Sequence, residues 1–217
     1  MVCKYLGKFN KAEKYYRTAL SHTDQCLEGL HKDFFLANLY HNLGGLEHSR
    51  KHFRRGESYT RKALRFRSKA VGPGNLAVAC DLAALAALLD AQKRYAEAEG
   101  LYRKVLKVYR REYGANHAEI AVVLNNLAAL FQATGRKKPA EAHYAAALKM
   151  KRKVLGSTHP DVAVTLNNLG TLSFKDGRKK EAARYFRKAI AILAQSFGSK
   201  HPNTRAVRHN LQRLIRT

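Results

Sequence analysis

Apolar residues recur along this chain at intervals of three and four positions, the pattern of a helix with one buried face. Between residues 118 and 133 they stand at Ile120, Leu124, Leu127 and Phe131. A second kind of segment carries small residues instead: Ala182 is followed by Phe186 and then by Ala189. Both spacings place their apolar residues on one side of a helix with 3.6 residues per turn. The alternation of the two patterns predicts pairs of amphipathic helices.

The helix pairs repeat every 42 residues. One leucine column shows the period throughout the chain, at Leu43, Leu85, Leu127, Leu169 and Leu211. A glycine column and a histidine column keep the same spacing, at Gly72, Gly114, Gly156, Gly198, His117, His159 and His201. A fixed period of this length indicates stacked structural repeats. We expect a single domain, 1–217, made of a partial repeat 1–30, the repeats 31–72, 73–114, 115–156 and 157–198, and a C-terminal capping helix 199–217.

Glycine and proline mark the ends of the predicted helices. Gly135 and Gly177 follow first helices, where a left-handed residue ends the helix. Pro160 and Pro202 stand where the next helix begins, a position that tolerates proline. A helical hairpin cannot bury its apolar stripe alone, whereas stacked hairpins bury it continuously. The predicted fold is therefore all-α, a right-handed α-solenoid of stacked helix-turn-helix hairpins.

The two helices of a repeat together carry a family signature. The sequence Leu169-Gly170, followed by Ala182, Phe186 and Ala189, resembles the tetratricopeptide repeat. The 42-residue spacing, with LNNLA opening a unit and LGxxHPD closing it, is similar to the kinesin-light-chain type of this repeat. In residues 33–70 the match weakens, because Gly56 and Thr60 replace the usual alanine and aromatic residue. The resemblance implies a non-enzymatic scaffold for protein–protein interactions.

Pairs of asparagines stand within the predicted first helices, in VLNNLAAL and in TLNNLGTL. An asparagine inside a helix costs a few tenths of a kcal/mol relative to alanine. The resemblance implies that the first helices line a concave groove, where an asparagine amide can bond both polar groups of one peptide unit of a ligand. Alternatively, these amides bond between adjacent helices or to water. The two roles are compatible.

The repeat register defines the residues expected to bind a peptide in the groove. They are Asn38, His41, Asn42, Asn125, Asn126, Asn167, Asn168, Thr171, Lys175, His209, Asn210 and Arg213. The repeat 73–114 lacks the asparagine pair and has Ala83 and Ala84 instead. This apolar gap is either a pocket for a bulky ligand side chain or no site at all.

The net charge of +25, with a pI near 10.3, indicates a partner that carries negative charge. Basic residues cluster in the second helices and in the turns, as in RKALRFRSK and the two GRKK segments, whereas the central groove is nearly neutral. A strong positive field attracts acidic proteins and nucleic acids. We expect an extended, acidic peptide or protein segment as ligand. The alternative is sequence-nonspecific binding of RNA, DNA or an anionic surface through the basic convex face and edges, although few aromatic residues are left for base stacking.

No motif for catalysis stands in the sequence. P-loop, GxSxG, HExxH and CxxC patterns are absent, so we expect no enzyme, cofactor or metal site. The periodic histidines are interpreted as helix caps or packing residues. Three sparse cysteines indicate a reducing, cytoplasmic compartment, and no apolar run is long enough to span a membrane. The N-terminal segment lacks its partner helix, and this open edge could mediate self-association.

Overall fold

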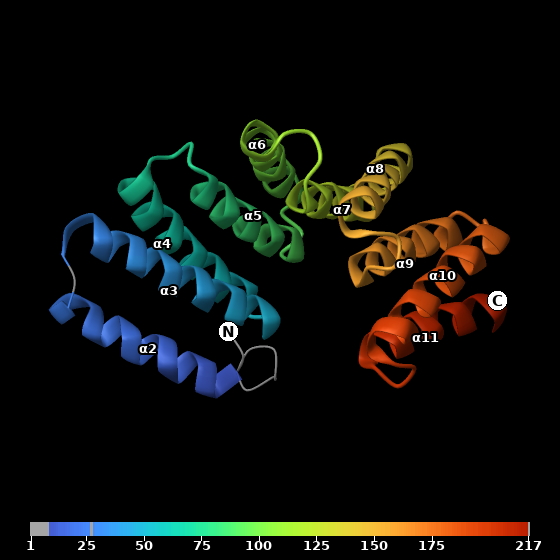
Figure 1. Cartoon of the computed structure of the whole chain (residues 1–217), viewed down its shortest axis with the longest axis horizontal. Helices are drawn as coiled ribbons and strands as arrows, with labels where there is room; N and C mark the ends of the chain where they lie inside the picture. Colours follow the sequence, from blue (N-terminus) through green and yellow to red (C-terminus); the bar gives the residue numbers. More distant parts are fainter. Residues whose placement is uncertain (1–8, 27, 217) are drawn as a thin grey trace. The chain divides into compact units, whose positions relative to one another are not determined.

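A computed structural model describes residues 9–26 and 28–216 of the chain, and those residues form ten helices without a strand. The helices are α2 to α11 in chain order (Figure 1). The chain divides into two compact units, residues 1–112 and 113–217. Each unit is a stack of antiparallel helices, and the predicted all-α class is confirmed. The assignment of all repeats to one domain stays a prediction.

The first unit contains the helices α2 (Phe9–Cys26), α3 (Gly29–Ser49), α4 (Phe53–Val71), α5 (Leu76–Ala91) and α6 (Tyr95–Tyr113). Helix α3 packs against α2 and α4, and α4 packs in turn against α5. Helix α6 returns along α5, where the hydroxyl of Tyr109 lies 3.5 Å from Sγ of Cys80. The buried residues Ala12, Leu43 and Leu46 join α2 to α3.

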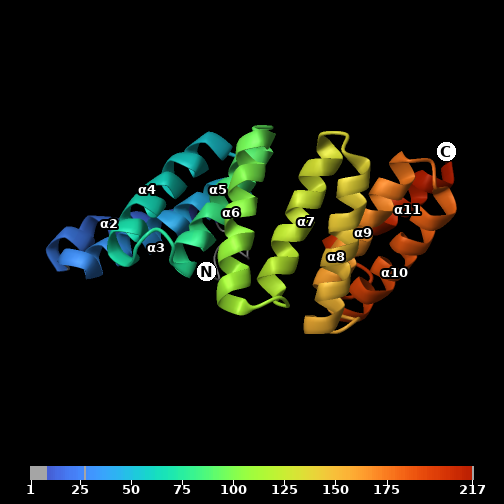
Figure 2. The same cartoon turned by 90° about the horizontal axis from the view of Figure 1, so that it is seen from above.

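The second unit contains α7 (Ala118–Ala133), α8 (Lys137–Leu155), α9 (Pro160–Lys175), α10 (Lys179–Phe197) and α11 (Pro202–Arg216). Helices α7 and α8 form one hairpin, α9 and α10 form the next, and α11 closes the stack against α10 and α9 (Figure 2). The apolar stripe predicted from the sequence is the core, because Ile120, Leu127 and Phe186 are each no more than 2% exposed.

The turn inside each hairpin requires one residue with positive φ. Gly135 and Gly177 adopt φ of 75° and 76°, as their position after a helix predicts. In the first unit the same repeat position is occupied by Lys51 and Lys93, with φ of 64° and 63°. A residue with a Cβ is strained there by about 1 kcal/mol relative to glycine. The first unit therefore places a charged side chain in both turns at a cost in local stability.

The periodic histidines cap the first helix of each hairpin. The Nδ1 atoms of His117, His159 and His201 accept hydrogen bonds from the backbone N–H two residues later, at 3.1 to 3.2 Å. Asn75 occupies the same column and caps α5 in the same way, through the N–H of Ala77. These bonds satisfy N–H groups that a helix leaves free in its first turn. The predicted capping role of the histidines is confirmed.

Close helix contacts explain why the repeat 31–72 departs from the family pattern. A Cβ on Gly170 would lie 2.7 Å from the ring of Phe186, so the glycine makes room for the aromatic residue of α10. In the first unit, a Cβ on Gly56 would lie 2.7 Å from Cδ2 of Leu88 and 3.1 Å from the carbonyl of Gly44. Helices α3 and α4 approach so closely there that an alanine and a large aromatic residue have no space.

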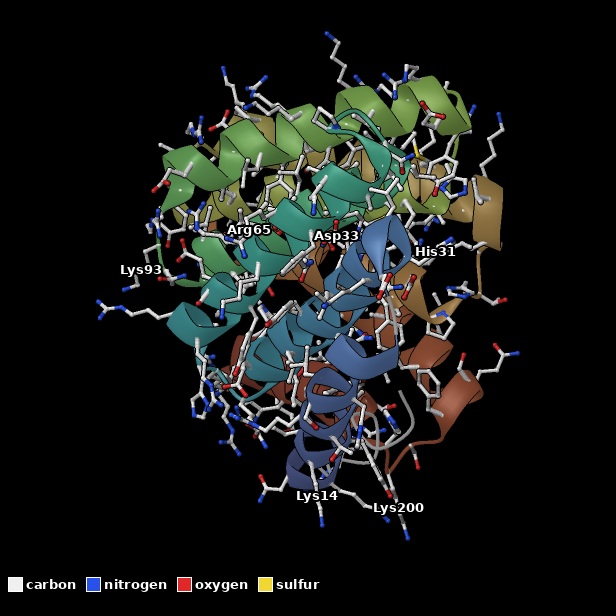
Figure 3. The ribbon with its side chains drawn as sticks, turned by 90° about the vertical axis from the view of Figure 1, so that its left-hand side faces the viewer. Lys14, His31, Asp33, Arg65, Lys93 and Lys200 are labelled. Atoms are coloured by element: carbon white, nitrogen blue, oxygen red, sulfur yellow. The ribbon has the colours of Figure 1, made fainter. Side chains whose placement is uncertain are left out.

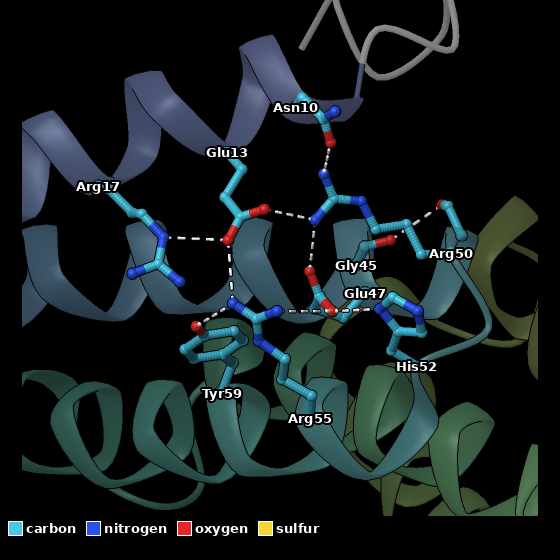
Figure 4. A network of polar contacts seen from close by, with 10 residues as sticks. Asn10, Glu13, Arg17, Gly45, Glu47, Arg50, His52, Arg55 and Tyr59 are labelled. Atoms are coloured by element: carbon cyan, nitrogen blue, oxygen red, sulfur yellow. Dashed lines mark hydrogen bonds and ion pairs between the residues drawn. The ribbon is translucent and has the colours of Figure 1, made fainter.

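Ion pairs also join consecutive hairpins within each unit. Arg94 contacts Glu57, and Arg178 contacts Glu141, in both cases from a turn to a helix 37 positions earlier (94 − 57 and 178 − 141). Arg50 contacts Glu13 in the same way (50 − 13), and also contacts the fully buried Glu47 (Figure 4). The hydrogen bond from Arg50 is the largest cause that lowers the pKa of Glu13 to about 2. This network fastens α2 to the α3–α4 hairpin.

Candidate functional site

The asparagine pairs of the second unit bond to one another across helices. The Oδ1 atom of Asn125 on α7 accepts hydrogen bonds from Oγ1 of Thr165 at 3.1 Å and from Nδ2 of Asn168 at 3.3 Å, both on α9. One repeat later, Nδ2 of Asn210 on α11 donates to Oδ1 of Asn167 at 2.9 Å. The first asparagine of a pair therefore accepts a bond from the second asparagine of the next repeat. This is the inter-helix role that the sequence left open.

The first unit makes an equivalent link with different side chains. His41 stands 84 positions before Asn125, and Asp81 stands 84 positions before Thr165, which is two repeats in each case. Nδ1 of His41 lies 2.6 Å from Oδ1 of Asp81, joining α3 to α5 as Asn125 and Thr165 join α7 to α9. The repeat that has Ala84 in place of an asparagine thus makes its link through the charged Asp81, three residues earlier.

Arg67 completes this buried network of the first unit. Its Nε donates to Oδ2 of Asp81 at 2.6 Å, and its NH1 group donates to Oδ1 of Asn38 at 2.9 Å. The guanidinium also lies 5.2 Å from the ring centroid of Phe34. Asp81 is fully buried and Arg67 is 5% exposed. Two of the residues predicted for the groove, Asn38 and His41, are therefore held by a buried ion pair.

The sequence reasoning missed Arg67 and Asp81. Asp81 could have been noticed, because it is the only charged residue in the first two turns of an otherwise apolar helix. Arg67 gave a weaker signal, since it lies in a basic segment with several other arginines. In the second unit, Lys151 stands at the repeat position that corresponds to Arg67. It is 4% exposed and donates from Nζ to the carbonyl of Asp161 at 3.1 Å. Burial lowers the pKa of this ammonium group.

Four of the predicted groove residues meet at one cavity in the second unit. The cavity has a volume of about 140 Å³ and is lined by Thr171, Phe174, Lys175, Phe186, Asn210 and Arg213. Its polar residues come from α9 and α11, whereas Phe186 of α10 supplies an apolar side. None of the six lining residues is acidic. Two cationic side chains thus lie near an amide and a hydroxyl around one small space.

The other predicted groove residues have varied environments. Asn42, Asn126 and Asn168 are partly exposed, His209 is exposed, and Asn125 is largely buried at 8% exposure. Asn38, His41 and Asn42 belong to the first unit, whereas the rest belong to the second. A groove shared by all twelve residues stays a prediction. The open N-terminal edge includes residues 1–8, which lie outside the described residues, so self-association through it also stays a prediction.

Neither a metal site nor a membrane span is found within the described part of the chain. In residues 9–26 and 28–216, no three His, Cys, Asp or Glu side chains are grouped so that they could hold a metal ion. None of the helices there has the length and apolar character needed to cross a bilayer. Cys80 is exposed, and Cys3 and Cys26 lie outside the described side chains.

Three solved structures show the same fold. BtubC (BKLC) from P. vanneervenii is 23% identical over 97% of this chain and 81% of its own length, with a TM-score of 0.72. A putative kinesin light chain with nearly identical TPR-like repeats from Podosopora anserina is 20% identical over 83% of this chain and 87% of its own, with a TM-score of 0.66. The apo form of RapI is 17% identical over 100% of this chain and 80% of its own, with a TM-score of 0.75.

Comparison with family models gives the assignment. No curated protein sequence matches this chain. The model of the tetratricopeptide repeat, in contrast, matches residues 35–111, 80–153, 140–195 and 161–214, and a second model of this repeat matches residues 1–21. Together they extend over nearly the whole sequence, in agreement with the observed helical hairpins and with the kinesin-light-chain-like spacing. The chain belongs to the tetratricopeptide repeat family.

Proposed function

We propose that this protein is a scaffold that binds an extended, acidic peptide or protein segment, with the cavity between α9 and α11 as its main contact point. The family consists of repeats that generally act as non-catalytic interaction modules, and the fold of this chain agrees with that role. The acidic character of the ligand, the site and a cytoplasmic location belong to the proposal.

The cavity of the second unit is the observation that carries this proposal. Lys175 and Arg213 bring two positive charges to a space of about 140 Å³, which is enough for a carboxylate group. Hydrogen bonds to an ionised group are about twice as strong as those between neutral groups. A carboxylate held by these cations would be partly shielded from water by the rings of Phe174 and Phe186.

The asparagine network supports the same site. Asn210 uses one amide hydrogen for Asn167 and retains a second N–H for a ligand. Because its orientation is set by the bond to Asn167, the amide is held in place before a ligand arrives. Such preorganisation lowers the entropy lost on binding. The asparagine pairs can therefore hold adjacent helices together and present donors to a peptide at the same time.

Binding of a fluorescein-labelled hexaglutamate peptide tests the proposal. Fluorescence anisotropy should show at least a tenfold loss of affinity for Lys175→Ala and for Arg213→Ala. The matched controls are Lys180→Ala and Arg216→Ala, which remove the same charges from exposed positions that do not line the cavity. Circular dichroism checks that all variants remain helical. Equal losses in the cavity variants and in the controls would show that the peptide responds only to net charge.

Nucleic-acid binding is the rival function, and the net charge of +25 favours it. A labelled single-stranded DNA of arbitrary sequence serves as the second probe. Binding through phosphates alone falls steeply with salt. Preference for DNA over the peptide at equal salt, with no difference between cavity and control variants, would replace the peptide proposal by the nucleic-acid one.

A further inference from the structure

A second cavity lies in the first unit, at the turn between α3 and α4. It has a volume of about 680 Å³ and is lined by Lys51, His52, Phe53, Arg54, Arg55, Gln92 and Arg94. The lining residues come from two neighbouring turns, α3–α4 and α5–α6. Four are lysine or arginine, and none is acidic. The cavity is made of residues other than those of the predicted peptide groove.

The positive charge of this cavity is only partly neutralised by the protein. Arg55 contacts Glu13 at 2.9 Å and Glu47 at 3.7 Å (Figure 4). Arg94 is bound by two carboxylates, Glu57 at 2.9 Å and Glu97 at 2.6 Å. Lys51 and Arg54 are exposed, and no acidic partner for either is found among the residues that the structure describes. The paired arginines keep their orientation through their carboxylates, while two further cations remain available to a ligand.

Lys51 stands in the turn between α3 and α4 with an unusual backbone conformation. Its φ of 64° is a conformation that the second unit gives to glycine, at Gly135 and Gly177. Lys93 has the same conformation, with φ of 63°, and does not line the cavity, so this strain belongs to the turn and is not evidence for a ligand. Arg54 lies in the first turn of α4, where the helix dipole disfavours a positive charge. Lys51 and Arg54 thus bring two cations to the same cavity.

We propose that this cavity is a binding site for a small ligand that carries an oligophosphate group. A phosphate group offers several acceptor oxygens and close to two negative charges. It matches a cluster that combines the fork-shaped guanidinium groups of arginine with a mobile lysine ammonium. A cavity of 680 Å³ accepts two or three linked phosphates, which would meet Lys51 and Arg54 beside the paired guanidinium groups of Arg55 and Arg94. The site is independent of the peptide-binding proposal, since its residues lie in the other unit.

The turn at Lys93 offers a matched control for the test. Lys93 occupies the same repeat position as Lys51, with φ of 63°, but it does not line the cavity. Figure 3 shows its side chain projecting outward from the ribbon. Lys51→Gly and Lys93→Gly remove one positive charge each and relieve the same backbone strain. Both variants should melt at a higher temperature than the parent chain, so a loss of binding in either cannot be ascribed to unfolding.

Isothermal titration calorimetry with tripolyphosphate, at constant ionic strength, measures the site. We expect Lys51→Gly and Arg54→Gln each to weaken binding at least fivefold, and Lys93→Gly to change it less than twofold. Similar affinities for Lys51→Gly and Lys93→Gly would overturn the proposal, because tripolyphosphate would then respond to net charge alone. Undetectable binding of tripolyphosphate to the parent protein would overturn it as well.

Two further probes distinguish the source of the phosphate. A phosphoserine peptide and a single-stranded DNA are titrated into the parent protein and the same variants. Tripolyphosphate binding that is stronger than either supports a free oligophosphate ligand. Binding of the phosphopeptide or the DNA that exceeds it, and that is lost in Lys51→Gly but kept in Lys93→Gly, would assign the cavity to a macromolecule and refute the small-ligand proposal.

Discussion

The buried pair between Arg67 and Asp81 leads to a quantitative prediction about the first unit. Asp81 is fully buried and Arg67 is 5% exposed, so removal of Asp81 leaves Arg67 without a carboxylate, and removal of Arg67 leaves Asp81 with His41 as its remaining partner. Such a loss costs about 3 to 5 kcal/mol, whereas replacement of both partners by apolar residues is often nearly neutral. Other repeats of the chain supply the apolar replacements. Leu193 stands at the repeat position that corresponds to Arg67, and Val207 at the position that corresponds to Asp81.

The perturbation is a double-mutant cycle with Asp81→Val, Arg67→Leu and the double variant. Each single variant should lose about 3 kcal/mol or more of unfolding free energy, since the carboxylate or guanidinium left behind is buried. The double variant should lose only about 1 kcal/mol, because the former partners His41 and Asn38 are exposed enough to be solvated. The coupling free energy of the pair is then about 5 kcal/mol (1 − 3 − 3 = −5).

Urea unfolding of the full chain, followed by circular dichroism, measures this cycle. The midpoint should shift at an unchanged slope, because the surface exposed on unfolding stays the same. The pair Arg103–Glu99 is the control, with the arginine 67% and the glutamate 16% exposed, and its coupling should not exceed about 1 kcal/mol. Additive losses in the Arg67–Asp81 cycle, or a loss below about 1 kcal/mol for Asp81→Val, would refute the reasoning.

Three further predictions concern charge and packing. The pKa of Glu13 is lowered from 4.5 to about 2, chiefly by Arg50, so its ionised form stabilises the fold above pH 4.5 and this contribution is lost as the pH falls towards 2. Glu13→Gln should therefore be less stable than the parent chain at pH 7 by about 2 to 3 kcal/mol and equally stable near pH 2. Urea titrations at each pH measure this, and a stability difference that does not change with pH would contradict the reasoning. Gly170→Ala should lose about 1 to 3 kcal/mol, because its Cβ would lie 2.7 Å from the ring of Phe186. Gly100→Ala in α6 has no neighbour within 4 Å of the added Cβ and should gain about 0.5 to 1 kcal/mol; equal thermal shifts for both alanine variants would show that helix propensity, and not packing, decides the outcome.

Much of the fold was accessible from the sequence because it depends on local patterns. The 3.6-residue periodicity, the histidine caps and Gly135 and Gly177 in the turns each involve residues close together in the chain. Because the repeats carry the same residue type at the same position several times, each local pattern is recognisable in the sequence. Lys51 and Lys93 are the exceptions, because a lysine with positive φ is not recognisable from its own sequence context.

The candidate sites were less accessible because they join residues about 40 positions apart. The sequence showed the asparagine pairs, but not that Asn125 would accept a bond from Asn168. The repeat register placed Thr171, Lys175, Asn210 and Arg213 among twelve predicted groove residues, without indicating that these four share one cavity.

The sequence by itself determined that the chain is a helical tetratricopeptide repeat protein with a strong positive charge. The physical reason is that periodicity, capping and composition are properties of short segments and of sums over the chain. Only the tertiary structure decided which polar groups meet. The pairing of His41 with Asp81, the burial of Arg67, and the convergence of Lys51, Arg54 and Arg94 on one cavity all depend on how neighbouring hairpins pack. Packing brings together side chains from different repeats, and the chemistry of a site belongs to such groups and not to any single segment.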